Sequence, residues 1–149
     1  MVTVFFLDGI GIGQMDVLTP DQRRKCMSHI RAKNTKPELA VRRVAHALGY
    51  RFRVHRTDLP GKPDLVFPSR RKVIFVHGCF WHRHEGCKLA SSPKSNLDYW
   101  VPKFERTTER DQSNIEKLSE KGWNSYVIWE CEIRDVELLA KSIVTFLDS

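Results

Sequence analysis

The sequence predicts an α/β fold in which a mixed central β-sheet is flanked by helices on both faces. Helical and strand-like patterns alternate after residue 60, which is typical of this class. Runs rich in Val, Ile and Phe at residues 64–67 and 72–77 are typical of central, buried strands. With 149 residues, 41% of them hydrophobic, the chain is long enough for one domain with its own core.

Two helices are predicted in the first fifty residues. The Thr-Pro pair at 19–20 is typical of an N-cap followed by proline, and it predicts a basic helix to about residue 32. A second helix begins at Pro37, and Gly49 ends it. Its buried face is indicated by apolar residues at helical spacing, namely Val41, Val44, Ala45 and Leu48.

The rest of the chain predicts four strands and two helices. Alternation of apolar and basic residues predicts a half-buried strand at 50–54, before the two central strands. A long helix is expected at 97–121, closed by Gly122, then a strand at 123–129. The final amphipathic helix is indicated by Val136, Leu139, Ala140, Ile143, Val144 and Leu147.

The N-terminal residues differ from the rest. We assign residues 1–15 to an N-terminal arm or extension and residues 16–149 to the folded domain. The apolar stretch at 2–7 is short and lacks a basic start, so we do not interpret it as a signal peptide. No apolar run is long enough to span a bilayer, and we therefore expect a soluble, cytoplasmic protein.

The charge balance indicates an anionic partner. Lysine and arginine number 25 against 18 aspartate and glutamate residues, which gives a net charge of +7. Nucleic acid is the commonest partner of such a chain, although a similar excess also serves solubility alone. Basic clusters at 23–25, 42–43, 51–56 and 70–72 flank the motifs described next, which favours a binding surface.

Three cysteines and a histidine indicate a metal site. An even number of cysteines could also form two disulfides, but the absence of a secretory signal favours metal ligation. Three thiolates and one imidazole are typical of a closed, structural Zn²⁺ site. The alternative is reduced cysteines beside a solvated histidine, and Cys26 stands apart in either case. The expected ligands are Cys79, His84, Cys87 and Cys131.

A second motif opens one of the central strands. Pro63 and Asp64 precede it, and another strand follows about ten residues later. This layout resembles the PD-(D/E)xK nuclease fold, in which two carboxylates and a lysine hold Mg²⁺ and orient water. Phosphodiester hydrolysis uses such an ion because negative charge builds up on the phosphate oxygens. Here residues 75–77 read Phe-Val-His instead of acid-x-Lys, so another group must serve.

Four segments between about residues 19 and 134 resemble the very short patch repair endonucleases, the Vsr family. The most specific is the run HGCFWH at 77–82; the others are LPGKPD at 59–64, ERD at 109–111 and VIWEC at 127–131. The resemblance implies a PD-(D/E)xK-like core with a structural Zn²⁺. It also implies Mg²⁺-dependent nicking of one DNA strand beside the thymine of a T:G mismatch, the product of 5-methylcytosine deamination.

The resemblance assigns the Mg²⁺ ligands. Asp64 would supply the carboxylate and Val76 its backbone carbonyl, at a position that is often threonine in the family. Glu38 would hydrogen-bond water around the ion. From the residues alone, a negative charge such as Glu38 near a helix start simply suits the helix dipole.

The resemblance also assigns the groups that handle the water and the phosphate. His82 would activate the water, Asp111 would hold its other ring nitrogen, and His77 would support the scissile phosphate. Independently, Asp111 lies on the apolar stripe of its helix, where an unpaired carboxylate is costly. Its partner could be His82, an arginine or a backbone group. Because spacing between the first two cysteines varies in the family, His82 is an alternative to His84 at the zinc.

The expected DNA contacts combine aromatic and basic residues. Phe80, Trp81 and Trp100 match the aromatic residues that the family inserts beside the mismatch, with Met27 entering from the opposite groove. Insertion of this kind unstacks a weak base step. The alternative is that Phe80 and Trp81 pack as core. Phosphate contacts are expected from Lys25, Arg31, Lys33 and Lys36.

Three functions are compatible with these motifs. The first is the mismatch nickase, whose partners would be double-stranded DNA with a T:G mismatch, mismatch-repair proteins and a cytosine methyltransferase system. The second is a restriction or homing-type endonuclease on the same core. The third is a non-catalytic, zinc-stapled DNA-binding module, which has no need of the set Glu38, Asp64, His82 and Asp111.

Overall fold

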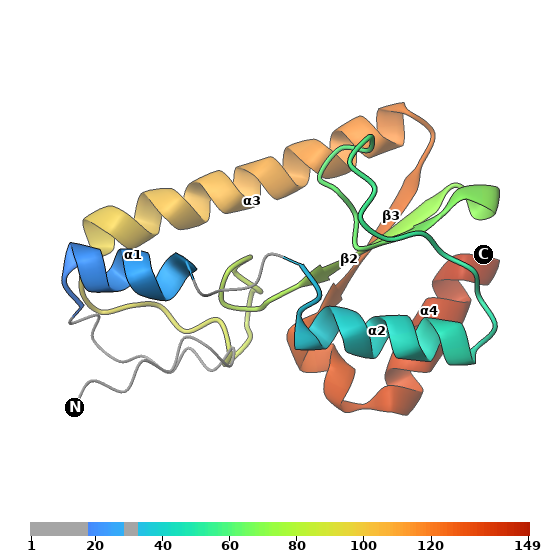
Figure 1. Ribbon diagram of the computed structural model, residues 1–149, viewed down its shortest axis with the longest axis horizontal. Coiled ribbons are helices and arrows are strands. Elements are labelled where there is room, and N and C mark those ends of the chain that lie inside the picture. The colour runs from blue at the N-terminus through green and yellow to red at the C-terminus, as the bar shows by residue number, and fades with distance from the viewer. Residues whose placement is uncertain (1–17, 29–32) are drawn as a thin grey trace.

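A computed structural model describes residues 18–28 and 33–149 of the chain (Figure 1). The expected arm at 1–15 and Arg31 therefore lie outside the described residues. The elements are α1 (Pro20–Ser28), α2 (Lys36–Ala47), β1 (Leu65–Phe67), η2 (Pro68–Arg70), β2 (Lys72–His77), α3 (Leu97–Glu120), β3 (Asn124–Trp129), η3 (Glu130–Arg134) and α4 (Val136–Asp148). No helix in the described part of the chain has the length and hydrophobicity to cross a membrane.

The sheet is mixed, as predicted, and has the strand order β1-β2-β3. β1 pairs antiparallel with β2, whereas β2 and β3 are parallel and are connected through α3. The register places His77, the last residue of β2, opposite Trp129, the last residue of β3. The loops after these two strands therefore start at the same edge of the sheet.

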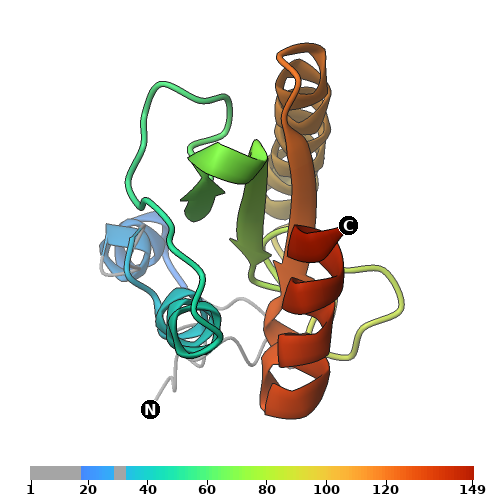
Figure 2. The same cartoon turned by 90° about the vertical axis from the view of Figure 1, so that its right-hand side faces the viewer.

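Helices cover both faces of the sheet because its side chains alternate between two cores. Leu65, Ile74 and Ile128 pack with buried residues of α2 and α4. Val66 and Val73 point to the other face, where they pack with Leu118 of α3. Figures 1 and 2 show the same arrangement, with α3 above the strands and α2 and α4 below them.

Helix starts follow local hydrogen bonding. Thr19 caps α1 as expected: its side-chain oxygen accepts from the Gln22 amide, and the Gln22 side chain accepts from the Thr19 amide. Thr35 caps α2, because its hydroxyl oxygen accepts from the Glu38 amide. This cap starts α2 one residue before the predicted Pro37 and places Glu38 in the first turn.

The predicted strand at residues 50–54 is wrong. Among the described residues, this segment makes only one isolated bridge, in which Arg53 and Val66 exchange two backbone hydrogen bonds of 2.8 and 2.9 Å. The alternation instead reflects burial, because Tyr50 and Phe52 lay their rings edge-on against Phe67. The segment covers the edge of the sheet without extending it, so the described sheet has three strands.

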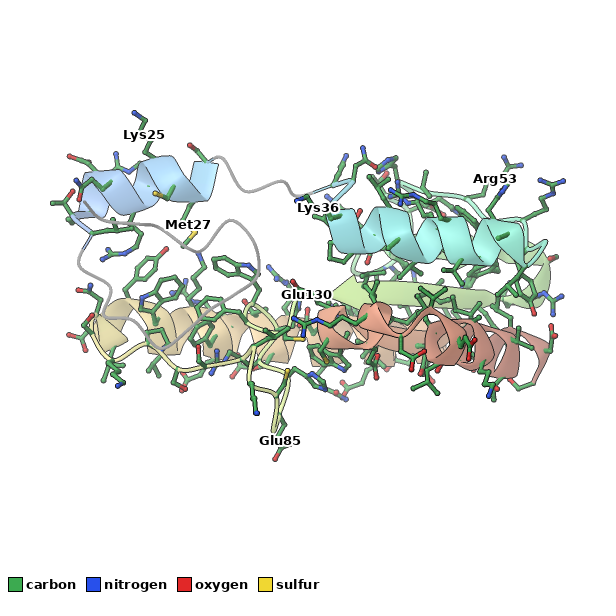
Figure 3. The ribbon with its side chains drawn as sticks, turned by 90° about the horizontal axis from the view of Figure 1, so that it is seen from below. Lys25, Met27, Lys36, Arg53, Glu85 and Glu130 are labelled. Atoms are coloured by element: carbon green, nitrogen blue, oxygen red, sulfur yellow. The ribbon has the colours of Figure 1, made fainter. Side chains whose placement is uncertain are left out.

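The first half of α3 extends beyond the sheet, and α1 lies just below it in Figure 1. Arg23 of α1 lies over the Tyr99 ring of α3, with 4.7 Å between the guanidinium carbon and the ring centroid. Figure 3, seen from below, also shows side chains filling the space between the two helices. Besides the two cores, the described residues thus form an aromatic cluster outside the sheet, built around Trp100.

Candidate active site and metal centre

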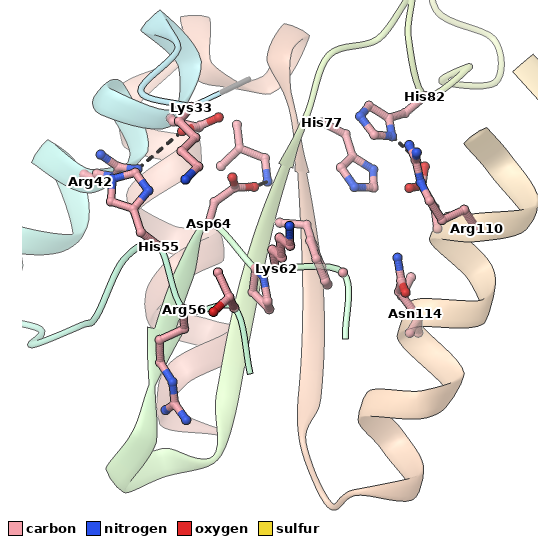
Figure 4. A pocket seen from close by; sticks show the side chains of 18 residues that line it. Lys33, Arg42, His55, Arg56, Lys62, Asp64, His77, His82, Arg110 and Asn114 are labelled. Atoms are coloured by element: carbon pink, nitrogen blue, oxygen red, sulfur yellow. Dashed lines mark hydrogen bonds and ion pairs between the residues drawn. The ribbon is translucent and has the colours of Figure 1, made fainter. Parts of the chain in front are cut away.

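A cavity of about 630 Å³ lies between α2, the start of β1, the end of β2 and α3 (Figure 4). All six residues assigned to the catalytic centre line it, although they come from four separate parts of the chain. They are Glu38, Asp64, Val76, His77, His82 and Asp111. The cavity therefore brings together the residues that the family resemblance selected.

Asp64 is held at the entrance to β1 by backbone contacts. Its amide donates to the Ile74 carbonyl at 3.1 Å, and its carboxylate accepts from the Val76 amide at 2.6 Å. Burial raises the pKa of Asp64 to about 7, and the neighbouring charge of Glu38 contributes to this rise. Few positive charges surround the Asp64 carboxylate, so a divalent cation bound to it would stabilise its ionised form.

Glu38 forms hydrogen bonds with other residues of this chain. Its side chain is buried, and one carboxylate oxygen accepts from the Asn34 amide at 2.8 Å and from Arg42 at 3.3 Å. Its charge nonetheless acts on Asp64, as the raised pKa of Asp64 shows. The helix-dipole explanation is therefore incomplete, because this carboxylate faces the cavity as well as its own helix terminus.

His82 and Asp111 form a tight pair across the cavity wall. Nδ1 of His82 lies 2.5 Å from a carboxylate oxygen of Asp111, so an N–H at this position donates to the carboxylate. In the neutral ring this pairing leaves Nε2 as the basic nitrogen. The partner of the Asp111 carboxylate is thus His82 rather than an arginine or a backbone group.

His77 stacks on His82. The two ring centroids are 3.8 Å apart and the rings are nearly parallel, at 7°. Burial lowers the pKa of His77 to about 4, and the charge of His82 contributes to this decrease. His77 is consequently neutral at physiological pH and can donate or accept a hydrogen bond without adding charge.

The four residues expected at the metal site do meet. One ligand atom from each of Cys79, His84, Cys87 and Cys131 lies within 4.8 Å of the others. Nδ1 of His84 is 3.6 Å from the Cys79 sulfur and 3.4 Å from the Cys131 sulfur. Tetrahedral Zn²⁺ with ordinary bond lengths would separate nitrogen and sulfur by about 3.5 Å. The cluster fits a tetrahedral metal, and it contains His84 rather than His82.

The cluster connects the two loops that start at the same sheet edge. Cys79 follows β2, whereas Cys131 lies in η3 after β3. Burial raises the pKa of the Cys79 thiol to about 12, so its thiolate would need a nearby cation. A metal at this point would supply that charge and hold the two loops together.

Trp129 joins the cluster to the cavity, although no sequence pattern assigns it a role in the site. Its ring stacks on His84 at 4.2 Å and meets the His77 ring edge-on at 5.3 Å. From the sequence, Trp129 could be placed only at the end of a predicted strand. The strand register shows that it lies opposite His77. These two ring contacts connect His77 to the metal cluster.

Other cavity residues were also missed. Arg42, Lys62, Arg110 and Asn114 line the same space. Lys62 lies within the LPGKPD segment, which was the available signal, whereas Arg110 and Asn114 follow from the helical face of Asp111. The cavity therefore carries more positive charge than the assigned residues alone provide.

The residues expected to contact DNA lie at the aromatic cluster and on the surface. Phe80 and Trp100 are buried, at 4% and 1% exposure, and their rings pack edge to face. Trp81 is half-buried, and Met27 points from α1 toward α3, whereas Lys25 points away (Figure 3). The side chains of Lys25, Lys33 and Lys36 are exposed.

The described elements form an α/β fold with a mixed sheet, which is also the fold of a solved nuclease domain. The chain is similar in structure to the catalytic domain of the homing endonuclease I-Bth0305I, with a TM-score of 0.52 and 18% identity. The match covers 76% of this chain and 94% of that domain. At this identity the likeness establishes the fold.

The chain belongs to the DNA mismatch endonuclease Vsr family, whose model matches residues 15–88. It is 53% identical over 133 residues to the type II nicking enzyme V.XorIIP of Xanthomonas oryzae pv. oryzae, covering 89% of this chain and 97% of that protein. It is 38% identical over 130 residues to the DNA mismatch endonuclease Vsr of Escherichia coli, covering 87% and 83%. The protein is a DNA endonuclease.

Proposed function

We propose that this endonuclease nicks one strand of double-stranded DNA beside the thymine of a T:G mismatch, by Mg²⁺-dependent hydrolysis. The observation that carries the proposal is the cavity in which Asp64 faces the pair of His82 and Asp111. The relatives support the mismatch as the target and a nick as the product, since one is a mismatch endonuclease and another a nicking enzyme. Mismatch-repair proteins and a cytosine methyltransferase system are the partners that this role implies.

The carboxylate of Asp64 and the carbonyl of Val76 would hold Mg²⁺, with Glu38 bonded to water around it. The ion would offset negative charge on the phosphate. Nε2 of His82 takes a proton from the attacking water, and Asp111 stabilises the imidazolium that results. His77, being neutral, donates a hydrogen bond to a phosphate oxygen while adding no repulsion to the charged His82 beside it.

The metal held by the cysteine cluster is proposed to be Zn²⁺. Three thiolates and one imidazole form a soft donor set, which favours zinc over the hard cations Mg²⁺ and Ca²⁺. The four ligands also close the coordination shell and leave no place for substrate. Zinc would accordingly serve the structure of the loops, and Mg²⁺ the chemistry.

A comparison of two duplexes tests the proposed function. Strand-labelled DNA with a T:G pair should be nicked in the thymine strand when Mg²⁺ is present, whereas the matched T:A duplex should be cut at least about tenfold more slowly. Cleavage of both strands at equal rates in either duplex would instead indicate the restriction or homing-type activity. Binding without any Mg²⁺-dependent cleavage would indicate the non-catalytic module.

The same duplexes test the insertion of Trp81. Among the three aromatic residues assigned to insertion, it is the one that is not fully buried, so its displacement disturbs the fold least. Replacing Trp81 with Ala should reduce cleavage of the T:G duplex by about 10- to 100-fold, as expected for the loss of one base-stacking contact. Affinity for the matched duplex should change little, and an equal loss on both duplexes would contradict insertion at the mismatch.

A further inference from the structure

We propose that Lys62 binds the phosphate that is cut, as a cationic contact additional to the metal. The inference rests on the proposed function and deepens it. Lys62 lines the cavity together with Asp64 and His77, and Figure 4 shows its side chain extending into the space between them. It reaches the site from the turn before β1 rather than from either strand.

The ammonium group of Lys62 is available for a substrate. Among the described residues, no carboxylate forms an ion pair with it and no oxygen accepts a hydrogen bond from it. Two other cations of the cavity are engaged, because Arg42 binds Glu38 and Arg56 binds Asp58. Lys33 and Arg110 also line the cavity, but Lys62 lies nearest to Asp64 in the chain, two residues before it.

The backbone at Lys62 also favours a role for its side chain. Its φ is 49°, in the left-handed region, where a residue with a β-carbon costs about 1 kcal/mol or more relative to glycine. Gly61 before it has a φ of 75°, and a β-carbon there would lie 3.0 Å from the Asn114 side chain. Close packing thus requires glycine at 61, whereas the turn alone would be better served by glycine at 62 as well.

The charges of the cavity explain why a cation is useful at this point. Three carboxylates line it, from Glu38, Asp64 and Asp111, and a phosphate would meet their repulsion. His77 offers no positive charge, because burial keeps it neutral. Lys62 adds a positive charge that forms no ion pair with these carboxylates. Because it lies beside Asp64, this charge would be close to a phosphate bound at the Mg²⁺ site.

Replacing Lys62 with glycine tests whether this residue serves the turn or contacts the phosphate. The K62G protein should keep or raise its thermal midpoint, because glycine suits the left-handed backbone. Its rate of T:G nicking in single-turnover experiments should nevertheless fall about 100-fold, while K62R should recover most of the rate. As the control, Lys141→Ala, which removes an exposed lysine of α4, should nick normally.

Binding to a modified duplex provides a readout apart from cleavage. Without added Mg²⁺, replacing the scissile phosphate by a neutral methylphosphonate should weaken binding to the wild-type protein by about fivefold or more, yet hardly weaken binding to K62G. Equal losses in both proteins, or wild-type nicking by K62G, would overturn the inference while leaving the proposed function intact. Failure of the wild-type protein to nick the T:G duplex would overturn both.

Discussion

Replacing Asp64 with Asn is expected to abolish nicking and to stabilise the protein when no Mg²⁺ is bound. The substitution keeps the shape of the side chain and an oxygen that can accept from the Val76 amide, a bond of 2.6 Å in the structure. It removes the charge that would hold Mg²⁺ in the cavity. Nicking of the T:G duplex should therefore fall by at least about a thousandfold at any Mg²⁺ concentration.

The stabilisation follows from the pKa of Asp64. Burial raises this pKa from 3.8 to about 7, so the folded protein binds more protons than the unfolded chain between these values. Stability consequently falls as the pH rises through this interval, and the full cost of the buried charge is present above pH 7. The Asn variant lacks this cost, so its advantage should be small near pH 4 and largest near pH 8.

Thermal unfolding without added Mg²⁺ measures this difference. At pH 8 the Asp64→Asn protein should be more stable by on the order of 1–2 kcal/mol, which corresponds to roughly 2–8 °C for a chain of this size. Glu105→Gln, a change at an exposed position in the interior of α3, serves as the control for loss of one negative charge. Substantial nicking by the Asn variant would contradict the assignment of Asp64, whatever its stability.

The elements that the sequence predicted well are those in which one physical signal dominates. The helices α2 and α4 have apolar stripes that pack on one face of the sheet, and their predicted spans differ from the structure by at most a few residues. The segment at 50–54 has an equally clear alternation of apolar residues, yet it forms one bridge. Alternation reports which side chains are buried, but pairing also requires a neighbouring strand at the right distance and register.

The candidate site was predictable in part for the same reason. Asp111 was identifiable from physics alone, because a carboxylate on an apolar stripe needs a partner, and His82 is that partner. Glu38 depended on the family resemblance. Lys62 and Trp129 were missed because their importance lies in what faces them: a cavity in one case, and the two histidines His77 and His84 in the other. Such relations depend on register and loop geometry.

Loss of the metal cluster should have the largest effect on stability. Replacing Cys131 with Ser removes the ligand that connects η3 to the loop after β2. Metal binding to a site that does not exist in the unfolded chain contributes directly to folding, so the variant should lose at least about 4 kcal/mol. Cys26→Ser is the matched control, because Cys26 is a half-buried free cysteine on α1 outside the cluster.

Metal analysis and unfolding together decide the role of the cluster. The wild-type protein and Cys26→Ser should each carry one zinc per chain, and Cys131→Ser should carry much less and unfold at a temperature lower by roughly 10 °C. A wild-type protein without zinc, or equal stability of the two serine variants, would contradict a structural metal. Because Trp129 stacks on His84 and touches His77, the loss of zinc should also slow nicking well below the unfolding temperature. The metal that stabilises the loops would then also position the histidines that act on the phosphate.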